Sequence, residues 1–492
     1  MNNGTKEGLL LDPGLGIALL AVFGLGWIAL GVWWGRKAKT TEGHMLAGRN
    51  VGLALGTATA AATWITSNTT MLAPQFALQL GIIGALAYCT ASFGLFLFAP
   101  MAARIRTLMP NGFTSVEFIR LRYGETAYWL FLLISIFYSM TWLVSMAMAG
   151  GIALEALSGI PYLTGMTVIL AVCVAYTVFG GLYAVIGTDF IQSIIILAGL
   201  VIVAVMILAK EPPGSVYERL EESRPMLLSA LFPAALMALF NNMLFGIGEI
   251  THSNVWWSRA FAMRKGVGAK AYLLGGLVWL PIPLVAGFLG LAAPALGINI
   301  LRPDVAGPVV AAEMLGTLGA VLVFIVVFCS LASSIDSLLA ATSDLITKDI
   351  VQNLFMKNAT DRQLRKVVMV VIIGLGVVTW LLCLGRSQTL AEVLFFAGPM
   401  VGATIWPIIA GLYWKRANPI GVSLAMLLGT AVGLSAYMTI GWYTGALVGT
   451  AVSFVIVVAS TALFPREFDW RRLRVSTAPV MPSDRIREEA AQ

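Results

Sequence analysis

The feature that most constrains this chain is a succession of apolar stretches, each about as long as a membrane is thick. The stretches run to roughly 20 residues, and a helix of that length crosses a bilayer core of about 30 Å. Hydrophobic residues make up 59% of the chain and charged residues 11%, whereas soluble domains carry roughly 25% charged residues. The sequence therefore predicts an all-α, polytopic membrane protein.

The boundaries of the apolar stretches predict thirteen transmembrane helices. We expect residues 1–464 to form one membrane domain and the polar residues 465–492 to form a cytoplasmic tail that is partly disordered. The predicted spans are 13–34, 52–79, 81–103, 127–153, 163–180, 183–209, 229–255, 271–295, 308–345, 367–385, 390–413, 419–440 and 442–464.

Lys and Arg residues are distributed unevenly between the two sides of these spans. If the N-terminus lies outside, 25 of the 31 basic residues fall on the cytoplasmic side, those of segment 259–270 among them. Such an asymmetry is the positive-inside rule. We therefore expect an N-out, C-in protein of a plasma membrane, and a bacterial inner membrane in particular. The same asymmetry explains the net charge of +7 without a nucleic-acid partner.

Two of the predicted spans look interrupted by polar residues. Each of them opens a set of five spans, and the two sets enter the membrane from opposite sides. Small polar residues can simply let helices pack closely, but interruptions at matching places of two inverted halves indicate a transporter site near the midplane. The interrupting residues are Thr66, Ser67, Asn68, Thr69, Thr70 and Pro74 in the first span, and Asn241, Asn242, Gly246, Gly248, Glu249, Thr251 and His252 in the second.

Five local motifs resemble those of the sodium/solute symporter family. In order, they are MLAGRN (45–50), GGLYAVIGTDFIQSIIILAGL (180–200), WWSRAFAMRK (256–265), ASSIDSLLAATSDLITKDI (332–350) and GLYWKRANPIGV (411–422). The resemblance implies a LeuT-type core of five plus five inverted helices. Residues 52–209 would form the first repeat and 229–413 the second, with one extra helix before (13–34) and two after (419–464). It also implies a secondary active symporter that couples inward sodium flow to the uptake of a small solute.

The resemblance places a sodium site between the first interrupted helix and the ninth span. Freed carbonyls at an unwound turn suit a hard cation, because they add oxygen ligands without a buried net charge. The alternative for the serines is hydrogen bonding to carbonyls of their own helix. The implied ligands are the carbonyls of Ala62, Ile65 and Ser330 and the hydroxyls of Ser333 and Ser334.

Asp189 matches an aspartate that some family members use in a second sodium site. Ser333, Asp336 and Ser337 would complete that site here. Asp336 departs from the family pattern, in which a small residue is usual. Two facing carboxylates would either neutralise two cations or share one proton, so Na⁺ and H⁺ are both candidate coupling ions. A salt bridge or a helix cap is the alternative role for Asp189.

Polar side chains near the two interruptions are the candidate solute ligands. Amides and hydroxyls suit a small polar molecule with both donors and acceptors, and no pocket arginine is evident for a carboxylate. The subgroup resemblance is to the urea/polyamine-type branch, so we expect urea, an amine or an amino-acid-like solute. His252 can equally be an interior histidine with its own partner, and Trp64 is expected to pack in the core. The predicted lining is Asn68, Thr69, Thr70, Gln75, Asn242, Glu249 and His252, with Tyr138 and Trp142 as packing neighbours.

Two other functional classes fit the sequence less well. A transporter-like sensor would need a separate signalling partner, because only about 28 residues follow the last span. An enzyme would need a nucleophile or metal constellation, and the two histidines, His44 and His252, lie on distant segments without an HExxH, GxSxG or P-loop pattern. We therefore expect a transporter without enzymatic activity, whose partners are the solute and the lipid bilayer. The sequence predicts no oligomeric state.

Overall fold

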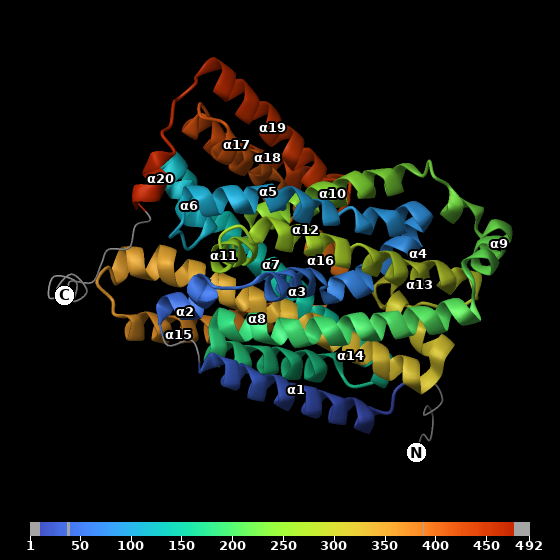
Figure 1. Cartoon of the computed structure of the whole chain (residues 1–492). Helices are drawn as coiled ribbons and strands as arrows, with labels where there is room; N and C mark the ends of the chain where they lie inside the picture. The colour runs from blue at the N-terminus through green and yellow to red at the C-terminus, as the bar shows by residue number, and fades with distance from the viewer. Residues whose placement is uncertain (1–9, 37–39, 387, 477–492) are drawn as a thin grey trace.

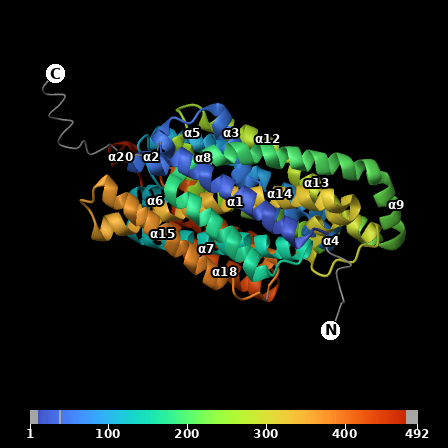
Figure 2. The same ribbon diagram turned by 90° about the horizontal axis from the view of Figure 1, so that it is seen from below.

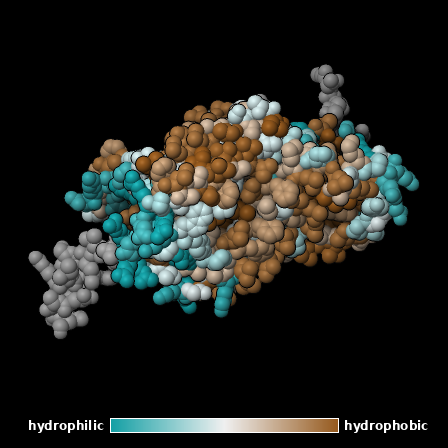
Figure 3. All heavy atoms as spheres, turned by 90° about the horizontal axis from the view of Figure 1, so that it is seen from above, coloured by the Kyte–Doolittle hydropathy of each residue, from teal (hydrophilic) through white to brown (hydrophobic). Residues whose placement is uncertain are grey.

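The computed structural model describes residues 10–36, 40–386 and 388–476, and within these ranges the chain is helical, with one isolated bridge between Val51 and Met263. Eleven of the described helical stretches are long and apolar enough to cross a membrane. They form an elongated bundle (Figure 1). The face shown in Figure 3 is hydrophobic in its middle and more hydrophilic toward the ends. The chain is therefore a multi-pass, all-α membrane protein, as predicted.

The helices follow the predicted spans closely, with short helices added in the connections. The longer elements, in chain order, are α1 (Pro13–Gly35), α3 (Leu53–Trp64), α4 (Ser67–Cys89), α5 (Ser92–Leu108), α7 (Glu125–Ser158), α8 (Tyr162–Lys210), α10 (Pro233–His252), α12 (Gly268–Trp279), α13 (Pro281–Ala295), α14 (Ala306–Leu345), α15 (Asp361–Leu382), α17 (Gly398–Tyr413), α18 (Pro419–Thr439) and α19 (Gly445–Leu463). The shorter ones are α2 (Thr41–Leu46), α6 (Ser115–Tyr123), α9 (Pro213–Ser223), α11 (Asn254–Ala262), α16 (Leu390–Phe395), α20 (Arg471–Ser476) and the π-helix η4 (Ile346–Phe355).

Two of the eleven stretches bend sharply at a glycine between two predicted spans, and a third, α14, bends in the same way within one predicted span, at Gly316 (φ 64°, ψ −152°). Gly81 in α4 has φ 71° and ψ −152°, and Gly181 in α8 has φ 52° and ψ −154°. Glycine adopts this region at no steric cost, whereas residues with a Cβ rarely do. The predicted count of thirteen spans requires the chain to cross the membrane on both sides of the bends at Gly81 and Gly181. That count and the N-out, C-in orientation stay predictions.

Both predicted interruptions are present, but the second lies later in the chain than predicted. The first separates α3 from α4 at Ile65 and Thr66, whose ψ values are 78° and 165°. The second separates α10 from α11 at Ser253, with ψ 131°. Residues 241–252 therefore form a continuous helix, and the prediction that they interrupt it was wrong. Gly246 and Gly248 instead allow close packing. A Cβ on Gly246 would lie 2.7 Å from the backbone of Ala91, just before α5, and a Cβ on Gly248 would lie 2.7 Å from the backbone of Val401 in α17.

The packing of the bundle places α14 at its centre. Its candidate span is among the most buried of the eleven, and α14 contacts α8, α7, α4 and α3. The outer helix α1 lies along α8, as Figure 2 shows from below. Since α14 touches α3 and α4 on either side of the first break, the polar run of α14 can meet the freed backbone groups there.

The first part of the predicted tail, which follows α19, packs against the helix ends. The backbone N–H of Phe468 donates to the Lys415 carbonyl at 2.9 Å. The guanidinium of Arg104 in α5 stacks 4.6 Å from the Trp470 ring centroid, and Leu473 is fully buried. Residues 465–474 are therefore ordered, whereas residues 477–492 of the predicted tail lie outside the described residues, and the expectation of partial disorder stays a prediction.

Candidate functional site

The serines of α14 meet the backbone at the first helix break. Ser333 Oγ donates to the carbonyl oxygen of Ala62 at 3.0 Å. The hydroxyls of Ser333 and Ser334 also lie 3.3 and 2.9 Å from the carbonyl oxygen of Ser330. Ile65 is fully buried at the break itself. The structure therefore brings Ala62, Ser330, Ser333 and Ser334 to one place, with Ile65 beside them.

This group consists of neutral oxygen atoms, which is the chemistry that a hard monovalent cation requires. The hydroxyl of Ser334 bonds within its own helix, as the alternative interpretation expected, but it does so to the same Ser330 carbonyl that the resemblance assigns to sodium. A hydroxyl oxygen that donates its hydrogen keeps lone pairs for another partner. The residues present therefore fit a sodium ion, which they would coordinate through neutral oxygen atoms.

A buried arginine occupies the place where a second cation was considered. Arg259 of α11 is 0% exposed, and its Nη2 donates to Asp189 Oδ2 at 3.2 Å and to Ser337 Oγ at 2.7 Å. The same guanidinium reaches α3, with Nε 3.0 Å from Thr59 Oγ1 and Nη2 2.8 Å from Thr63 Oγ1. Asp189 thus forms the salt bridge considered as its alternative role. Sequence reasoning missed this arginine because it counted Arg259 with the cytoplasmic basic residues.

Asp336 lies next to this salt bridge and is also fully buried. Its Oδ2 accepts a hydrogen bond from the Tyr176 hydroxyl at 2.9 Å, and its Oδ1 accepts one from Ser337 Oγ at 3.2 Å. Ser337 therefore joins Asp336 to the Arg259–Asp189 pair. The guanidinium thus pairs directly with Asp189 and reaches Asp336 only through Ser337, whereas the Ser333 hydroxyl lies at the Ala62 carbonyl.

A small cavity with room for about one water molecule, about 10 Å³ in volume, lies beside the first break. Two predicted solute ligands, Thr69 and Asn242, line it together with the predicted packing neighbour Trp142. Asn242 Nδ2 donates to the carbonyls of Ala87 and Tyr88 at 2.8 and 3.2 Å, which holds its amide at the cavity wall. The full lining is Trp64, Thr66, Thr69, Tyr88, Ala91, Trp142, Asn242, Phe245, Trp279 and Leu394.

Aromatic residues make up half of the residues that line this cavity. Trp142 stacks between Trp64 (ring centroids 6.2 Å apart, planes at 25°) and Phe245 (6.2 Å, 9°). Trp279 lies 5.8 Å from Trp64 and donates to the Trp64 carbonyl at 2.6 Å. Aromatic walls with a few fixed polar groups are typical of small-molecule sites. Sequence reasoning assigned Trp64 to core packing, because apolar composition alone does not distinguish a cavity wall from a core.

A second polar group, around Glu249, lies at the end of α10. The Tyr138 hydroxyl and the Trp256 Nε1 both donate to Glu249 Oε1, at 2.5 and 3.0 Å. His252 Nε2 lies 3.0 Å from Ser135 Oγ. Glu249 Oε2 and His252 Nδ1 are buried without a hydrogen-bond partner among the described residues. This group touches the cavity wall, since the rings of Tyr138 and Trp142 are 6.2 Å apart.

The other predicted solute ligands point away from the cavity. Asn68 Nδ2 donates to Ser145 Oγ of α7 at 3.1 Å. The Thr70 hydroxyl donates to the Ser67 carbonyl at 3.0 Å, and Gln75 Nε2 donates to Gln79 Oε1 at 3.3 Å. The structure therefore does not bring Asn68, Thr70 or Gln75 together with Thr69 and Asn242.

Comparison with known proteins places this geometry in a group of transporters. A model of the Sodium:solute symporter family matches residues 44–429. The urea-proton symporter DUR3 of Oryza sativa subsp. japonica is 26% identical, over 92% of this chain and 71% of its own length. The osmoregulated proline transporter OpuE of Bacillus subtilis (strain 168) is 26% identical, over 85% of this chain and 87% of its own.

Solved structures show the same fold. A Na⁺-coupled sialic acid symporter in a substrate-bound, outward-open state superimposes with a TM-score of 0.76 at 18% identity, over 92% of this chain and 99% of that one. The nucleobase-cation-symport-1 family transporter Mhp1, in a closed conformation with bromovinylhydantoin bound, gives a TM-score of 0.56 at 17% identity, over 87% and 96%. The predicted LeuT-type fold with its five-plus-five inverted repeat is confirmed.

Proposed function

The chain belongs to the sodium:solute symporter family, and we propose that it couples inward sodium flow to the uptake of a small polar solute by alternating access. The observation that carries the proposal is the contact between Ser333 Oγ and the Ala62 carbonyl at the first helix break. Its transporter relatives support it as well. The proposed location is a plasma membrane, specifically a bacterial inner membrane, and the proposed role is not enzymatic.

The proposed ion site acts by joining two helices. A sodium ion between the carbonyls of α3 and the hydroxyls of α14 would hold the break of the first helix against α14. For this, the Ser333 hydroxyl must turn its hydrogen away from the Ala62 carbonyl, so that both oxygens face the ion. Loss of the ion leaves one neutral hydrogen bond, worth about 1 kcal/mol, across that contact. Ion binding therefore favours the state in which α3 and α14 are joined, and ion release allows them to separate.

The proposed solute is urea, with an amine or an amino-acid-like molecule as alternatives. The cavity offers stacked rings together with the hydroxyl of Thr69 and the amide of Asn242, and none of the described residues that line it is cationic. Such a lining suits a neutral molecule better than a carboxylate. Glu249 Oε2 can accept N–H groups from a solute that moves past Trp142. Several relatives are named as urea transporters, which supports the same choice.

A proton is the alternative coupling ion. Asp189 pairs with Arg259, whereas Asp336 is buried beside this pair without an ion-pair partner among the described residues, and an acidic side chain in a membrane interior favours the uptake of a cation or a proton. The relative DUR3, named a urea-proton symporter, favours this alternative, and the neutral oxygens around Ser333 favour sodium.

Uptake by purified protein in proteoliposomes tests the proposal. Radiolabelled urea, amino acids and polyamines are offered under an inward sodium gradient at equal pH on both sides, and under an inward proton gradient without sodium. We expect urea to accumulate under the sodium gradient alone. Accumulation under the proton gradient in sodium-free buffer would reassign the coupling ion. If no solute accumulates under either gradient, the protein is better explained as a transporter-like sensor with a separate partner.

A further inference from the structure

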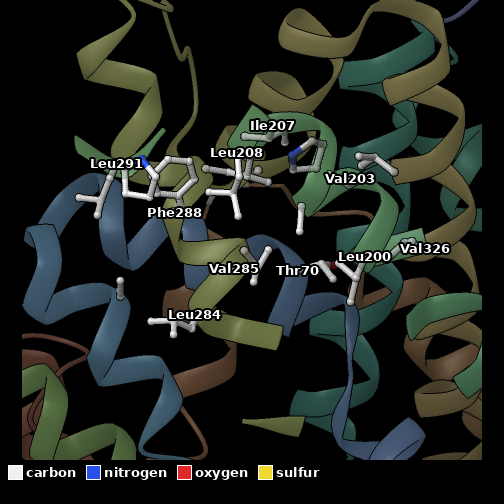
Figure 4. Close-up of a pocket in the computed structure, with 18 of the residues that line it drawn as sticks. Thr70, Leu200, Val203, Ile207, Leu208, Leu284, Val285, Phe288, Leu291 and Val326 are labelled. Carbon is white, nitrogen blue, oxygen red and sulfur yellow. The ribbon is translucent and has the colours of Figure 1, made fainter. Parts of the chain in front are cut away.

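A large apolar cavity, separate from the solute cavity, opens on the side of the bundle (Figure 4). Its volume is about 1180 Å³, counting the part that is open to the surroundings. The labelled side chains of α8 and α13 converge on this space, among them Leu208 and Phe288. α4 and α14 complete the walls, with Thr70 and Val326.

The cavity separates two pairs of closely packed helices. α13 packs along α4, and α14 packs along α8, more extensively than either pair packs on the other. Glycines make the first pair tight, because a Cβ on Gly290 would lie 2.1 Å from the Pro74 carbonyl oxygen. The space between the pairs is therefore bounded by two rigid walls and is open at one edge.

The chemistry of the lining excludes a polar occupant. Thr70 is the one polar side chain among the described residues that line the cavity, and its hydroxyl already donates to the Ser67 carbonyl at 3.0 Å. Water or a polar solute there would find one acceptor, Thr70 Oγ1, which is fewer than the two to four partners that a buried water needs, and apolar cavities of this kind stay dry and accept hydrocarbon. The solute proposed above therefore does not fit here.

The mouth of the cavity faces the bilayer. Leu86, Leu208 and Leu284 are lining residues that are 42%, 39% and 49% exposed. Their apolar neighbour Val205 on α8 is 62% exposed. Exposed apolar surface on a membrane-spanning helix is covered by lipid chains, so hydrocarbon is available at the mouth in any bilayer.

One basic residue, Lys210, comes between two cavity-lining residues along the sequence. Lys210 ends α8, between the lining residues Leu208 and Pro213. Its ammonium group is exposed and donates one hydrogen bond, to the Met314 carbonyl at 2.6 Å. An ammonium has three donors, so Lys210 can also contact a phosphate at the end of an acyl chain.

We propose that this cavity binds one acyl chain of a membrane phospholipid, with its phosphate group at Lys210. The chain lies between the α4–α13 pair and the α8–α14 pair and reaches Thr70, four residues beyond the first helix break. The bound chain acts as a spacer that stabilises the conformation with the two pairs apart. The site does not depend on the identity of the ion or of the transported solute.

Neighbouring tryptophan substitutions on α8 test the site in the full-length protein. Ala204→Trp fills the cavity, because Ala204 lines it. Val205→Trp is the matched control, since the next residue is exposed outside it. After delipidation in detergent, phospholipid that remains bound is extracted and measured by mass spectrometry. The shift in Tm on adding phosphatidylglycerol is measured in parallel.

We expect wild type and Val205→Trp to retain phospholipid and to gain Tm on its addition, and Ala204→Trp to lose about tenfold in retained lipid. Leu284→Trp at the half-exposed mouth should give the same loss, and it serves if Ala204→Trp does not fold. Lys210→Gln should lower the preference for phosphatidylglycerol over a free fatty acid. Equal lipid retention by all variants, or retention of fatty acid or detergent in place of phospholipid, would overturn the proposal.

Discussion

At both helix breaks a few non-helical residues separate two helices, but the polar groups around the two breaks differ. At the first break, between α3 and α4, the groups that face α14 are neutral carbonyl and hydroxyl oxygens. At the second break, between α10 and α11, the carboxyl group of Glu249 and the imidazole of His252 lie nearby, each with one buried atom that has no hydrogen-bond partner among the described residues. Neutral oxygens favour a cation, whereas an unpartnered carboxylate oxygen favours an N–H donor. The inverted repeat thus supplies two helix breaks, and the side chains around each break determine what can bind there.

Arg259 connects the two breaks. It lies on α11, six residues after Ser253, and its guanidinium contacts Thr59 and Thr63 on α3, just before the first break. It also pairs with Asp189 on α8. A displacement at either break must therefore move or stretch the same hydrogen bonds. Loss of Arg259 should therefore affect both breaks together.

Arg259→Gln should produce the largest effect. It leaves Asp189 as a buried carboxylate without its cation, and breaking a buried pair in this way costs about 3–5 kcal/mol. We expect a large fall in Tm in detergent and loss of uptake. Arg264→Gln is the control, since Arg264 is exposed and contacts Asn50, so it should change stability little. Equal Tm values for the two variants would show that the buried pair does not hold the breaks together.

Glu249→Gln should have the next largest effect, and it should act on the second break alone. In this variant an amide NH₂ can face the solute in place of Glu249 Oε2, and unpaired buried donors cost about 1–3 kcal/mol, so we expect solute uptake to fall at least about tenfold. The sodium concentration for half-maximal uptake should not change, because Glu249 has no contact with the serines of α14. Tyr138→Phe, which removes one donor to Glu249, should give a smaller loss. A changed sodium requirement in Glu249→Gln would contradict the separate roles of the two breaks.

Ser333→Ala should affect the first break alone, by a smaller amount. Removal of one hydroxyl ligand should raise the sodium concentration for half-maximal uptake about tenfold, which corresponds to about 1.4 kcal/mol. Uptake at saturating sodium should stay near that of wild type, and Ser334→Ala should behave similarly. Ser343→Ala is the control on the same helix, because its hydroxyl bonds the Ala340 carbonyl within α14. Wild-type sodium dependence in both test variants would remove the sodium assignment.

The fold could be predicted well because the membrane imposes it. Apolar stretches of spanning length and polar clusters within two of them sufficed to predict the helices and both breaks. The position of the second break could not be predicted, because Gly246 and Gly248 serve helix packing and the chain turns at Ser253 instead. Local composition does not distinguish a glycine that breaks a helix from one that lets another helix approach.

The site was predictable where it depends on backbone and motif, and less so where it depends on side-chain direction. Ser333 and Ala62 meet as the resemblance implied. Asn68 and Thr70 follow the same break, yet each hydrogen-bonds away from the cavity, because successive residues of a helix face different directions. Arg259 was misplaced because charge counting assigns an arginine near a membrane edge to water, and only tertiary contacts with Asp189 and α3 explain its burial.

The caps of the two half-helices provide the smallest and most direct test of the comparison. Thr66 and Thr69 form a reciprocal capping box at the start of α4, in which the Thr69 N–H donates to Thr66 Oγ1 at 3.2 Å. Ser253 caps α11 by accepting one hydrogen bond of 3.3 Å from the Val255 N–H. Loss of an N-cap hydroxyl costs about 1 kcal/mol, and each substitution removes one cap bond of similar length. Thr66→Ala and Ser253→Ala should therefore each lower the free energy of unfolding by about that amount. Denaturant unfolding in detergent measures both changes. A clearly larger cost for one of the two variants would mean that one break depends on its cap more than the other does, which the two geometries do not imply.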